Sequence, residues 1–553
     1  MSSKKPFRVV IIGGSVSGLT MAHTLERAGI EYVLLERGSE VTFNGGASIG
    51  LQPHGLRIMD QMGMYEDILG TTAPMIRADH RHPSGEPIAQ SEFMLQIEER
   101  HGYPILFFER AEMLEILYNH LPDKPKILCS NKVVNIQSTP EYATATTEDG
   151  TNYTADMIIG ADGVNSTTRK MMWKMMADTD PDLVQKESTS MFSDYSCTFG
   201  VSIFDSEDPD LRPGVSHINY GEKQSHICII STRNRKFWFL ILKHDKRYYA
   251  PNIPRYTNVD LEASVLKHSA IRVTEHSTLG DLWKHRSKCT MVCLEEAMFD
   301  RWSHDRLVLL GDSVHKVTPN AGHGGNTAIE SAAVLANFLY EAKMGTRQGS
   351  SLSHEGLLAI FQEYQSSREV RVANACQKSS AATRLQAMDN FLWKSGALQF
   401  VPMLGEDMEV NAASALIMGG EPLKFLEYKG KNGSIPWDGW DLATLADSEK
   451  RSFFDSVLGY SIYLALPLVL LWTLRETSVW ISPVLSAAND FNGTASSETR
   501  SIQGSLTHNS YFLSTATSKP WCLISACVEI LSIGLLMAVE GFRASEPWKF
   551  RLE

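Results

Sequence analysis

The first 37 residues alternate apolar and polar blocks in an order that predicts a strand, a helix and a second strand. FRVVII, at residues 7–12, has the length and apolar character of a buried strand. LTMAHTLERAG, at residues 19–29, has apolar residues at helical spacing and ends at Gly29, and EYVLLE follows as the next strand. This order predicts a βαβ unit with a right-handed crossover and parallel strands.

Further along the chain the pattern changes. Residues 126–161 alternate strands with turns and end in DMIIGADG. Between residues 180 and 300, SCTFGVSIF, SHICIIST and KFWFLILKH are rich in β-forming residues, which predicts an antiparallel sheet. Residues 306–340 return to a strand, a loop and a helix, and residues 355–400 are mostly helical. The predicted fold class is α/β, with a Rossmann-like nucleotide-binding domain into which an antiparallel β-sheet domain is inserted.

The C-terminal part contains two long apolar runs. Residues 457–474 carry no charge and approach the length of about 20 residues that a bilayer-spanning helix needs. Residues 521–541 are long enough, but Glu529 near their middle would cost on the order of a few kcal/mol in a bilayer. We expect C-terminal helical membrane segments here. A buried helical hairpin, or a helix pair lying on the membrane, is the alternative.

Composition and charge narrow the class of partner. With 43% hydrophobic and 21% charged residues, the chain is an ordinary folded protein of more than one domain. Its net charge of −12 argues against nucleic acid, whose phosphates need a basic face. The cysteines lack CxxC spacing and paired His/Cys arrays, which predicts reduced thiols and no metal site. They are Cys129, Cys197, Cys228, Cys289, Cys293, Cys376, Cys522 and Cys527.

The turn after the first strand, GGSVSG, nearly matches the dinucleotide-binding fingerprint. In that fingerprint the first glycine makes the turn, the second admits the pyrophosphate, and the third lets the helix pack closely. Gly13 and Gly18 take the first and third places, and Ser15 takes the second. The Ser15 hydroxyl can donate to a phosphate at the helix N-terminus, and Glu36 can accept from ribose hydroxyls. An ordinary strand–turn–helix of small residues is the alternative.

Two later strand ends add carboxylates and flexible backbone. DMIIGADGVNSTTR places Asp162 in a glycine-rich turn, and LVLLGDSVHKVTPNAGHGGN places Asp312 before Pro319 and the loop 322–326. Because parallel strands deliver their ends to one crevice, we expect these groups to converge there. Asp312 can accept from the ribityl hydroxyls of a flavin, and the N–H groups that open the next helix can face its ring. Taken singly, each aspartate is better explained as a helix cap or turn former.

Together and in this order, these three motifs resemble the class A flavoprotein monooxygenases, which share the fold of para-hydroxybenzoate hydroxylase. The resemblance covers residues 7–400. ASIGLQPHG (47–55) and FFERAEMLEIL (107–117) resemble the fungal branch that serves paxilline-type indole diterpenes and meroterpenoids, in which GGS variants of the turn are familiar. The apolar C-terminal runs also resemble that branch.

The resemblance implies roles for particular residues. It places FAD contacts on Glu36, Gly50, Arg110, Asp312 and Gly325. It gives Asp162 a position shared between FAD and NAD(P)H, and it gives Tyr220 the position of a catalytic tyrosine in the substrate sheet. From the residues alone, Tyr220 is one of 17 tyrosines, and Arg110 is equally explained as a surface arginine.

The implied activity is that of an FAD-dependent monooxygenase. NADPH or NADH reduces the flavin, O₂ adds to form a C4a-hydroperoxyflavin, and oxygen passes to a hydrophobic prenylated substrate. We expect epoxidation of a prenyl-chain olefin of a meroterpenoid or indole diterpene precursor in fungal secondary metabolism. Phenol hydroxylation, prenyl-lipid reduction and a non-catalytic scaffold are the alternatives. The expected partner is a downstream membrane terpene cyclase, and the expected location is the endoplasmic reticulum membrane with the catalytic domain in the cytosol.

The predicted domain organisation follows from the same patterns. Residues 1–180 form the first part of the FAD-binding domain, residues 181–300 the substrate-binding sheet, and residues 301–400 the second part of the FAD-binding domain with its helices. Residues 401–456 are a linker, residues 457–541 two membrane-spanning helices with their loop, and residues 542–553 a cytosolic tail.

Overall fold

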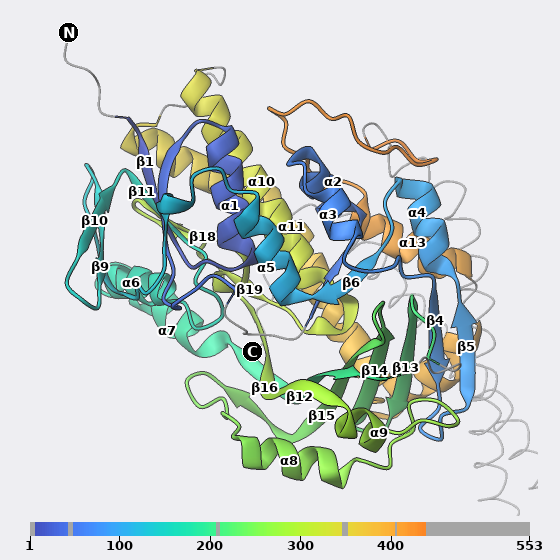
Figure 1. Ribbon diagram of the computed structural model, residues 1–553. Helices are drawn as coiled ribbons and strands as arrows, with labels where there is room; N and C mark the ends of the chain where they lie inside the picture. The colour runs from blue at the N-terminus through green and yellow to red at the C-terminus, as the bar shows by residue number, and fades with distance from the viewer. Residues whose placement is uncertain (1–5, 43–47, 206–210, 346–351, 404–405, 438–553) are drawn as a thin grey trace, which may run out of the picture. The chain divides into compact units, whose positions relative to one another are not determined.

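Figure 1 shows the computed structural model of the chain. The structure describes residues 6–42, 48–205, 211–345, 352–403 and 406–437. Within these ranges two large sheets dominate, one of six strands and one of eight. Helices cover both sheets, and the strands of each come from distant parts of the sequence.

The six-stranded sheet is a parallel layer with one antiparallel edge strand. Its order is β17-β18-β11-β1-β2-β7. The strands are β1 (Arg8–Ile12), β2 (Glu31–Leu35), β7 (Ile127–Leu128), β11 (Met157–Gly160), β17 (Ser303–His304) and β18 (Leu307–Leu309). β1 runs parallel to β2 and β11, and helix α1 (Val16–Arg27) connects β1 to β2. The predicted βαβ unit is therefore confirmed.

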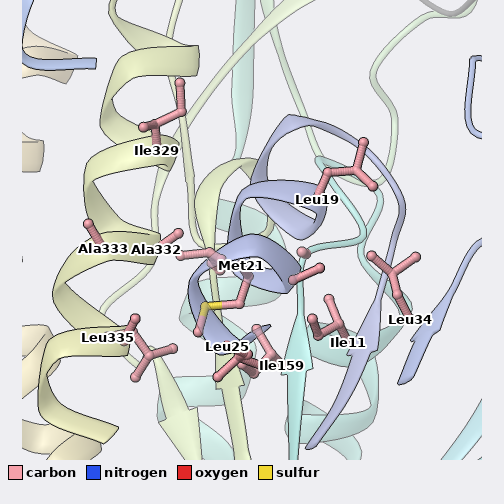
Figure 2. Packing of buried hydrophobic residues seen from close by; sticks show 14 of the residues in the cluster. Ile11, Leu19, Met21, Leu25, Leu34, Ile159, Ile329, Ala332, Ala333 and Leu335 are labelled. Atoms are coloured by element: carbon pink, nitrogen blue, oxygen red, sulfur yellow. The ribbon is translucent and has the colours of Figure 1, made fainter. Parts of the chain in front are cut away.

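Helices α1 and α10 (His323–Met344) pack together over the centre of this sheet (Figure 2). Met21 of α1 points toward Ala332 and Ala333 of α10, and Leu25 of α1 lies beside Ile159 of β11. All five side chains are fully buried. The alanines let the two helices come close, and removing apolar surface from water stabilises the layer by roughly 25 cal/mol per Å². The start of α10 is thereby held rigidly beside the sheet.

The eight-stranded sheet has the order β19-β16-β12-β15-β14-β13-β4-β5. Its antiparallel centre consists of β12 (Phe192–Ile203), β13 (Val215–Gly221), β14 (Gln224–Ile230), β15 (Arg235–Tyr249) and β16 (Arg286–Met298). Two strands from earlier in the chain, β4 (Arg77–Arg81) and β5 (Pro87–Ser91), extend it, and β19 (His315–Lys316) closes the other edge. β4 runs parallel to β13. The sheet is therefore mixed, and it draws strands from three regions of the sequence.

The two faces of this sheet have different surroundings. The strand register places Phe199, Ile227 and Phe239 on one face, which we call the front face. The opposite, back face carries Trp238 and Leu240 and packs against helices α8 (Asn258–Lys267) and α9 (Leu279–Lys284). In Figure 1 these two helices lie on the side of the sheet away from α10.

The remaining elements connect and cover the two sheets. The helices are α2 (Pro53–Gln61), α3 (Tyr65–Leu69), α4 (Phe93–His101), α5 (Arg110–Asn119), α6 (Thr167–Met176), α7 (Pro181–Ser190), α11 (His354–Gln386), α12 (Phe391–Ser395) and α13 (Glu406–Ile417). An antiparallel pair is formed by β3 (Ser48–Leu51) and β6 (Leu106–Glu109), and a three-stranded sheet by β8 (Val133–Ser138), β9 (Ala143–Thr147) and β10 (Asn152–Ala155). The β3–β6 pair contacts the eight-stranded sheet through Phe107 and the start of α10 through Gly50.

The structure corrects the membrane part of the predicted fold class. No helix in the described residues is both long and apolar enough to cross a bilayer. The longest ones, α10 and α11, contain charged residues such as Glu330 and Arg368, which form a buried ion pair. The prediction of C-terminal membrane segments and of a location in the endoplasmic reticulum membrane is therefore wrong for the described fold. The runs at 457–474 and 521–541 lie outside the described residues.

Candidate functional site

The turn between β1 and α1 leaves no space for a side chain at its outer glycines. Gly13 has a φ of +106°, and a Cβ there would lie 2.4 Å from the carbonyl oxygen of Ala161. A Cβ on Gly18 would lie 1.9 Å from the carbonyl oxygen of Gly13. Both neighbours are backbone, which cannot rotate away, so both positions require glycine. The turn therefore has the tight geometry that a bound pyrophosphate needs.

Ser15 is the N-cap of α1, and it also holds a cation in place. Its hydroxyl accepts a hydrogen bond from Arg110 Nη2 at 2.6 Å. Arg110, the first residue of α5, is thereby fixed at the N-terminus of α1. Backbone N–H groups and the helix dipole favour an anion at such a terminus. Ser15 and Arg110 therefore act as one unit, a role for the serine that its place in the fingerprint does not suggest.

Glu36, directly after β2, is fixed by backbone donors on both carboxylate oxygens. Gly14 N donates to Oε2 at 2.6 Å, and Gly38 N donates to Oε1 at 2.7 Å. Each oxygen has a further lone pair, so the carboxylate can still accept from ribose hydroxyls. Glu36 therefore lies beside the turn with its carboxylate held in place, and its contact with a ribose stays a prediction.

Asp312 joins this charged group from the other side. It lies in the short turn Gly311–Ser313 after β18, and Lys316 Nζ is 2.6 Å from its Oδ2. Burial raises the pKa of Asp312, but Lys316 and Arg110 nearby outweigh that effect and hold its pKa below the ordinary value. Burial lowers the pKa of Arg110, while the charges of Asp312 and Glu36 oppose that shift. Three predicted residues from three parts of the chain therefore share one electrostatic environment.

Asn326 joins the start of α10 to β3. Its Nδ2 donates to the carbonyl of Gly50 at 2.9 Å, and its Oδ1 accepts from Gln52 N at 2.9 Å. Next to it, Gly325 lies so close to Ile49 that a Cβ would be 2.8 Å from Cδ1 of the isoleucine. The two glycines that the resemblance assigns to FAD, Gly50 and Gly325, are therefore held together at one place.

Asp162 is close to this site through its backbone, but its carboxylate points to a helix. A Cβ on Gly13 would lie 2.9 Å from Asp162 Cα. The carboxylate accepts from Ser166 Oγ at 2.5 Å and from Thr168 N at 2.9 Å, and so caps α6. This is the helix-cap role that explains an isolated aspartate. A role for Asp162 in holding FAD or NAD(P)H stays a prediction.

Tyr220 lies on the front face of the eight-stranded sheet. Its hydroxyl is 2.9 Å from His80 Nδ1 on the neighbouring strand β4, and His80 Nε2 is 3.7 Å from Glu409 Oε1 of α13. Burial lowers the pKa of His80 to about 4 and raises the pKa of Tyr220. Both side chains are therefore neutral at neutral pH.

Phe107 of β6 connects the front face to the cofactor residues. It pairs with Gly50 in the β3–β6 register, and a Cβ on Gly50 would lie 3.3 Å from its ring. The same ring packs edge-on against Phe237 and Phe239, with centroids 5.4 and 6.2 Å away. The strand that carries Gly50 therefore adjoins the apolar front face.

Sequence reasoning missed His80, Glu409, Lys316 and Phe107. Lys316 had a local signal, because it stands four residues after Asp312. His80 and Tyr220 are 140 residues apart and meet only because β4 pairs with β13.

A glycine turn, a carboxylate for ribose, a fixed arginine and an ionised aspartate together fit a flavin dinucleotide.

Comparisons with known proteins agree with this fit. Residues 7–356 match the family described as the FAD binding domain. The FAD-dependent monooxygenase ausM of Penicillium brasilianum is 39% identical over 397 residues, which cover 71% of this chain and 82% of the relative. The FAD-dependent monooxygenase ptmM of Penicillium ochrochloron is 39% identical over 428 residues, which cover 77% of this chain and 100% of the relative.

Solved structures show the same fold. HpxO of Klebsiella pneumoniae, in complex with FAD and uric acid, aligns with a TM-score of 0.60 at 21% identity. The alignment covers 74% of this chain and 96% of that one. At this identity the likeness supports the fold, and the family match and the fungal relatives support the activity. The chain therefore belongs to the class A FAD-dependent monooxygenases of fungal secondary metabolism, with FAD as its cofactor.

Proposed function

We propose that this monooxygenase takes electrons from NADPH or NADH and transfers one oxygen atom of O₂ to an apolar prenylated molecule, forming an epoxide at an isolated olefin. The observation that carries this proposal is the apolar front face beside the strand of Gly50. Its half-buried side chains are Phe107, Phe199, Ile218 and Ile229, which pack on a fully buried apolar cluster. Such a surface suits a terpenoid chain better than a charged aromatic acid.

The protein's contribution is orientation and exclusion of water. When bound, FAD activates O₂ so that one oxygen atom of O₂ passes to the substrate, a chemistry that belongs to the cofactor. Glu36, Arg110 and Asp312 hold its polar parts, as argued above. The apolar front face buries a prenyl chain at a gain of roughly 25 cal/mol per Å² and keeps water away from the reacting atoms.

Tyr220, His80 and Glu409 orient the polar end of the substrate. The carboxylate of Glu409 favours a proton on Nε2 of His80, which leaves Nδ1 to accept from the Tyr220 hydroxyl. Tyr220 Oη then offers its lone pairs to a donor group on the substrate. Exposure rises along this array, from 3% for Tyr220 to 11% and 18% for the side chains of His80 and Glu409. Glu409 therefore lies at the end of the array that is nearest to solvent.

The test is product analysis with matched substrates. Protein reconstituted with FAD is incubated in air with NADPH and a prenylated aromatic or indole diterpene precursor, and in parallel with the same compound carrying a saturated chain. We expect one added oxygen in the prenyl chain and no oxygenation of the saturated analogue. Oxygen on the aromatic ring would instead establish a phenol hydroxylase. NADPH oxidation with an oxygen-free, reduced product would establish a prenyl-lipid reductase.

The same assay tests which electron donor the enzyme prefers and which enzyme uses its product. Comparing kcat/KM for NADPH and NADH decides which donor the enzyme prefers. An epoxide product is opened by protonation in a cyclisation, so the proposed downstream partner is a terpene cyclase. Adding such a cyclase to the assay should convert the epoxide to a cyclic product; a hydroxylated arene would not react.

A further inference from the structure

The back face of the eight-stranded sheet contains a cleft that takes no part in the site described above. Its volume is about 290 Å³. That is close to the lower end of small-molecule sites, which span about 300–1,000 Å³, so the cleft suits a small ligand. The lining residues are Arg77, Asp79, Arg81, Arg212, Thr274, Glu275 and His276.

The cations of this cleft are held in place by their neighbours. Arg77 Nε is 2.7 Å from Asp79 Oδ1, and Arg81 Nη2 is 3.4 Å from Asp79 Oδ2. Arg81 also donates to the carbonyl of Gly85 at 2.8 Å and to His217 Nδ1 at 3.2 Å. A ligand would therefore meet guanidinium groups that are already positioned, which reduces the entropy cost of binding.

The charges of the lining favour an anion. Three arginines and two carboxylates, Asp79 and Glu275, line the cleft, so the lining carries one more cationic arginine than anionic carboxylates. The Asp79 side chain is 1% exposed and lies between two arginines, whereas 32% of the Arg77 side chain is open to solvent. The planar guanidinium matches the oxygens of phosphate groups and binds them in pairs of hydrogen bonds.

We propose that this cleft binds a phosphate-bearing anion, with a diphosphate as the best match to its several guanidinium groups. Successive residues of a strand point to opposite faces. Asp79 and Arg81 thus line the cleft on the back face, while His80 between them contacts Tyr220 on the front face. A ligand in the cleft therefore braces the strand that positions His80. The inference does not depend on the substrate proposed above.

The test is calorimetric titration of the FAD-loaded protein with inorganic pyrophosphate at constant ionic strength. We expect saturable binding to the wild type and binding about tenfold weaker or more in Arg77→Gln/Arg212→Gln, because charge-assisted hydrogen bonds are lost. Arg233→Gln changes an exposed arginine in the turn between β14 and β15, outside the cleft; it is the control and should bind like the wild type. No saturable binding to the wild type, or equal binding by the double variant, would overturn the proposal.

A second variant guards against misfolding of the first. Glu275→Gln removes a negative charge from the lining and should bind pyrophosphate a few-fold more tightly, an outcome that damage to the fold cannot produce. Malonate serves as a competing anion, and malonate binding as tight as that of pyrophosphate would overturn the assignment to phosphate. Titration with adenosine 2′-phosphate separates the sources: tighter binding than pyrophosphate assigns the cleft to a nucleotide, and weaker binding assigns it to an inorganic anion.

Discussion

The turn after β1 and the front face of the eight-stranded sheet would hold the cofactor and the proposed substrate by opposite means. The turn uses backbone: Gly13 and Gly18 exclude any side chain, and Glu36 is fixed by backbone N–H groups. The front face uses side chains, with half-buried Phe107 and Phe199 beside a buried pair, Tyr220 and His80. Backbone geometry suits a cofactor that never changes, whereas side chains can be exchanged when the substrate changes. The two regions should therefore respond differently to single substitutions.

The largest effect is expected from Gly18→Ala. The added Cβ would lie 1.9 Å from a carbonyl oxygen, so the turn or the helix must move. We expect a loss of stability on the order of 4 kcal/mol or more and little retained FAD, measured by thermal unfolding and by flavin absorbance. Gly70→Ala, where the new Cβ meets its nearest atom at 3.4 Å, is the matched control. Full FAD retention by Gly18→Ala would contradict the backbone argument.

Asp312→Ala tests the side-chain part of the cofactor site. An ionised acceptor for the ribityl hydroxyls disappears, and Lys316 loses its ion pair. We expect FAD affinity to fall by about 2 to 3 kcal/mol, the size of a hydrogen bond to a charged group. The measurement is the FAD dissociation constant by fluorescence quenching. Unchanged affinity would remove Asp312 from the site.

His80 should make the substrate sheet sensitive to acid. Its pKa is about 4 in the folded protein against an ordinary 6.5, because burial outweighs the nearby charge of Asp79. As pH falls through this window, only the unfolded chain takes up the proton, so stability is lost. Between pH 7 and pH 5 the loss from His80 is about 2 kcal/mol. Chemical denaturation of His80→Gln should show a pH-dependent loss smaller by that amount, and exposed His285→Gln should behave like the wild type.

Tyr220→Phe should separate turnover from cofactor binding. The hydroxyl bonded to His80 is removed while the apolar packing remains. We expect kcat to fall about tenfold, the equivalent of one hydrogen bond, with FAD content unchanged. Glu409→Gln should reduce kcat in the same direction and shift the pH profile, which a packing defect would not do. Equal rates in all three proteins would leave Tyr220 as a packing residue.

The smallest effect is expected from Ser15→Gly. Glycine fits the turn, but Arg110 loses the hydroxyl that accepts its hydrogen bond. We expect FAD affinity to fall by about 1 kcal/mol or less. Arg110→Gln, measured in the same titration, should cost more because the cation itself is lost. A Ser15→Gly loss as large as that of Arg110→Gln would mean that the serine contacts the cofactor directly.

Those parts of the site that depend on neighbouring residues could be predicted from the sequence. The spacing of Gly13, Gly18 and Glu36 reflects a single βαβ unit, so the pattern is visible in one short stretch. Asp312 was predicted for a similar reason, since it lies in the turn that follows a strand. Asp162 satisfied the same pattern, but its carboxylate caps α6, which shows that a strand-end aspartate serves either purpose.

The parts that depend on distant pairing could not be predicted. β4 enters the substrate sheet by parallel pairing with β13, and no local pattern in residues 77–81 reports that partner. The contact of His80 with Tyr220 and Glu409 follows from this pairing. Membrane segments were predicted from the apolar runs at 457–474 and 521–541, which lie outside the described residues. No helix of the described fold is long and apolar enough to cross a bilayer.

The hydrogen bonds that join Asn326 to Gly50 and Gln52 act as a clip, and this clip has a consequence for biosynthesis. One side chain ties the segment around Gly50 to the first turn of α10, so strands made early by the ribosome wait for a residue made much later. β1 likewise waits for β11, its parallel neighbour. A nascent chain that ends before Asn326 lacks both the clip and Asp312's neighbour α10. Because Asn326 and Asp312 lie far along the chain, a complete cofactor site requires most of the chain to have been synthesised.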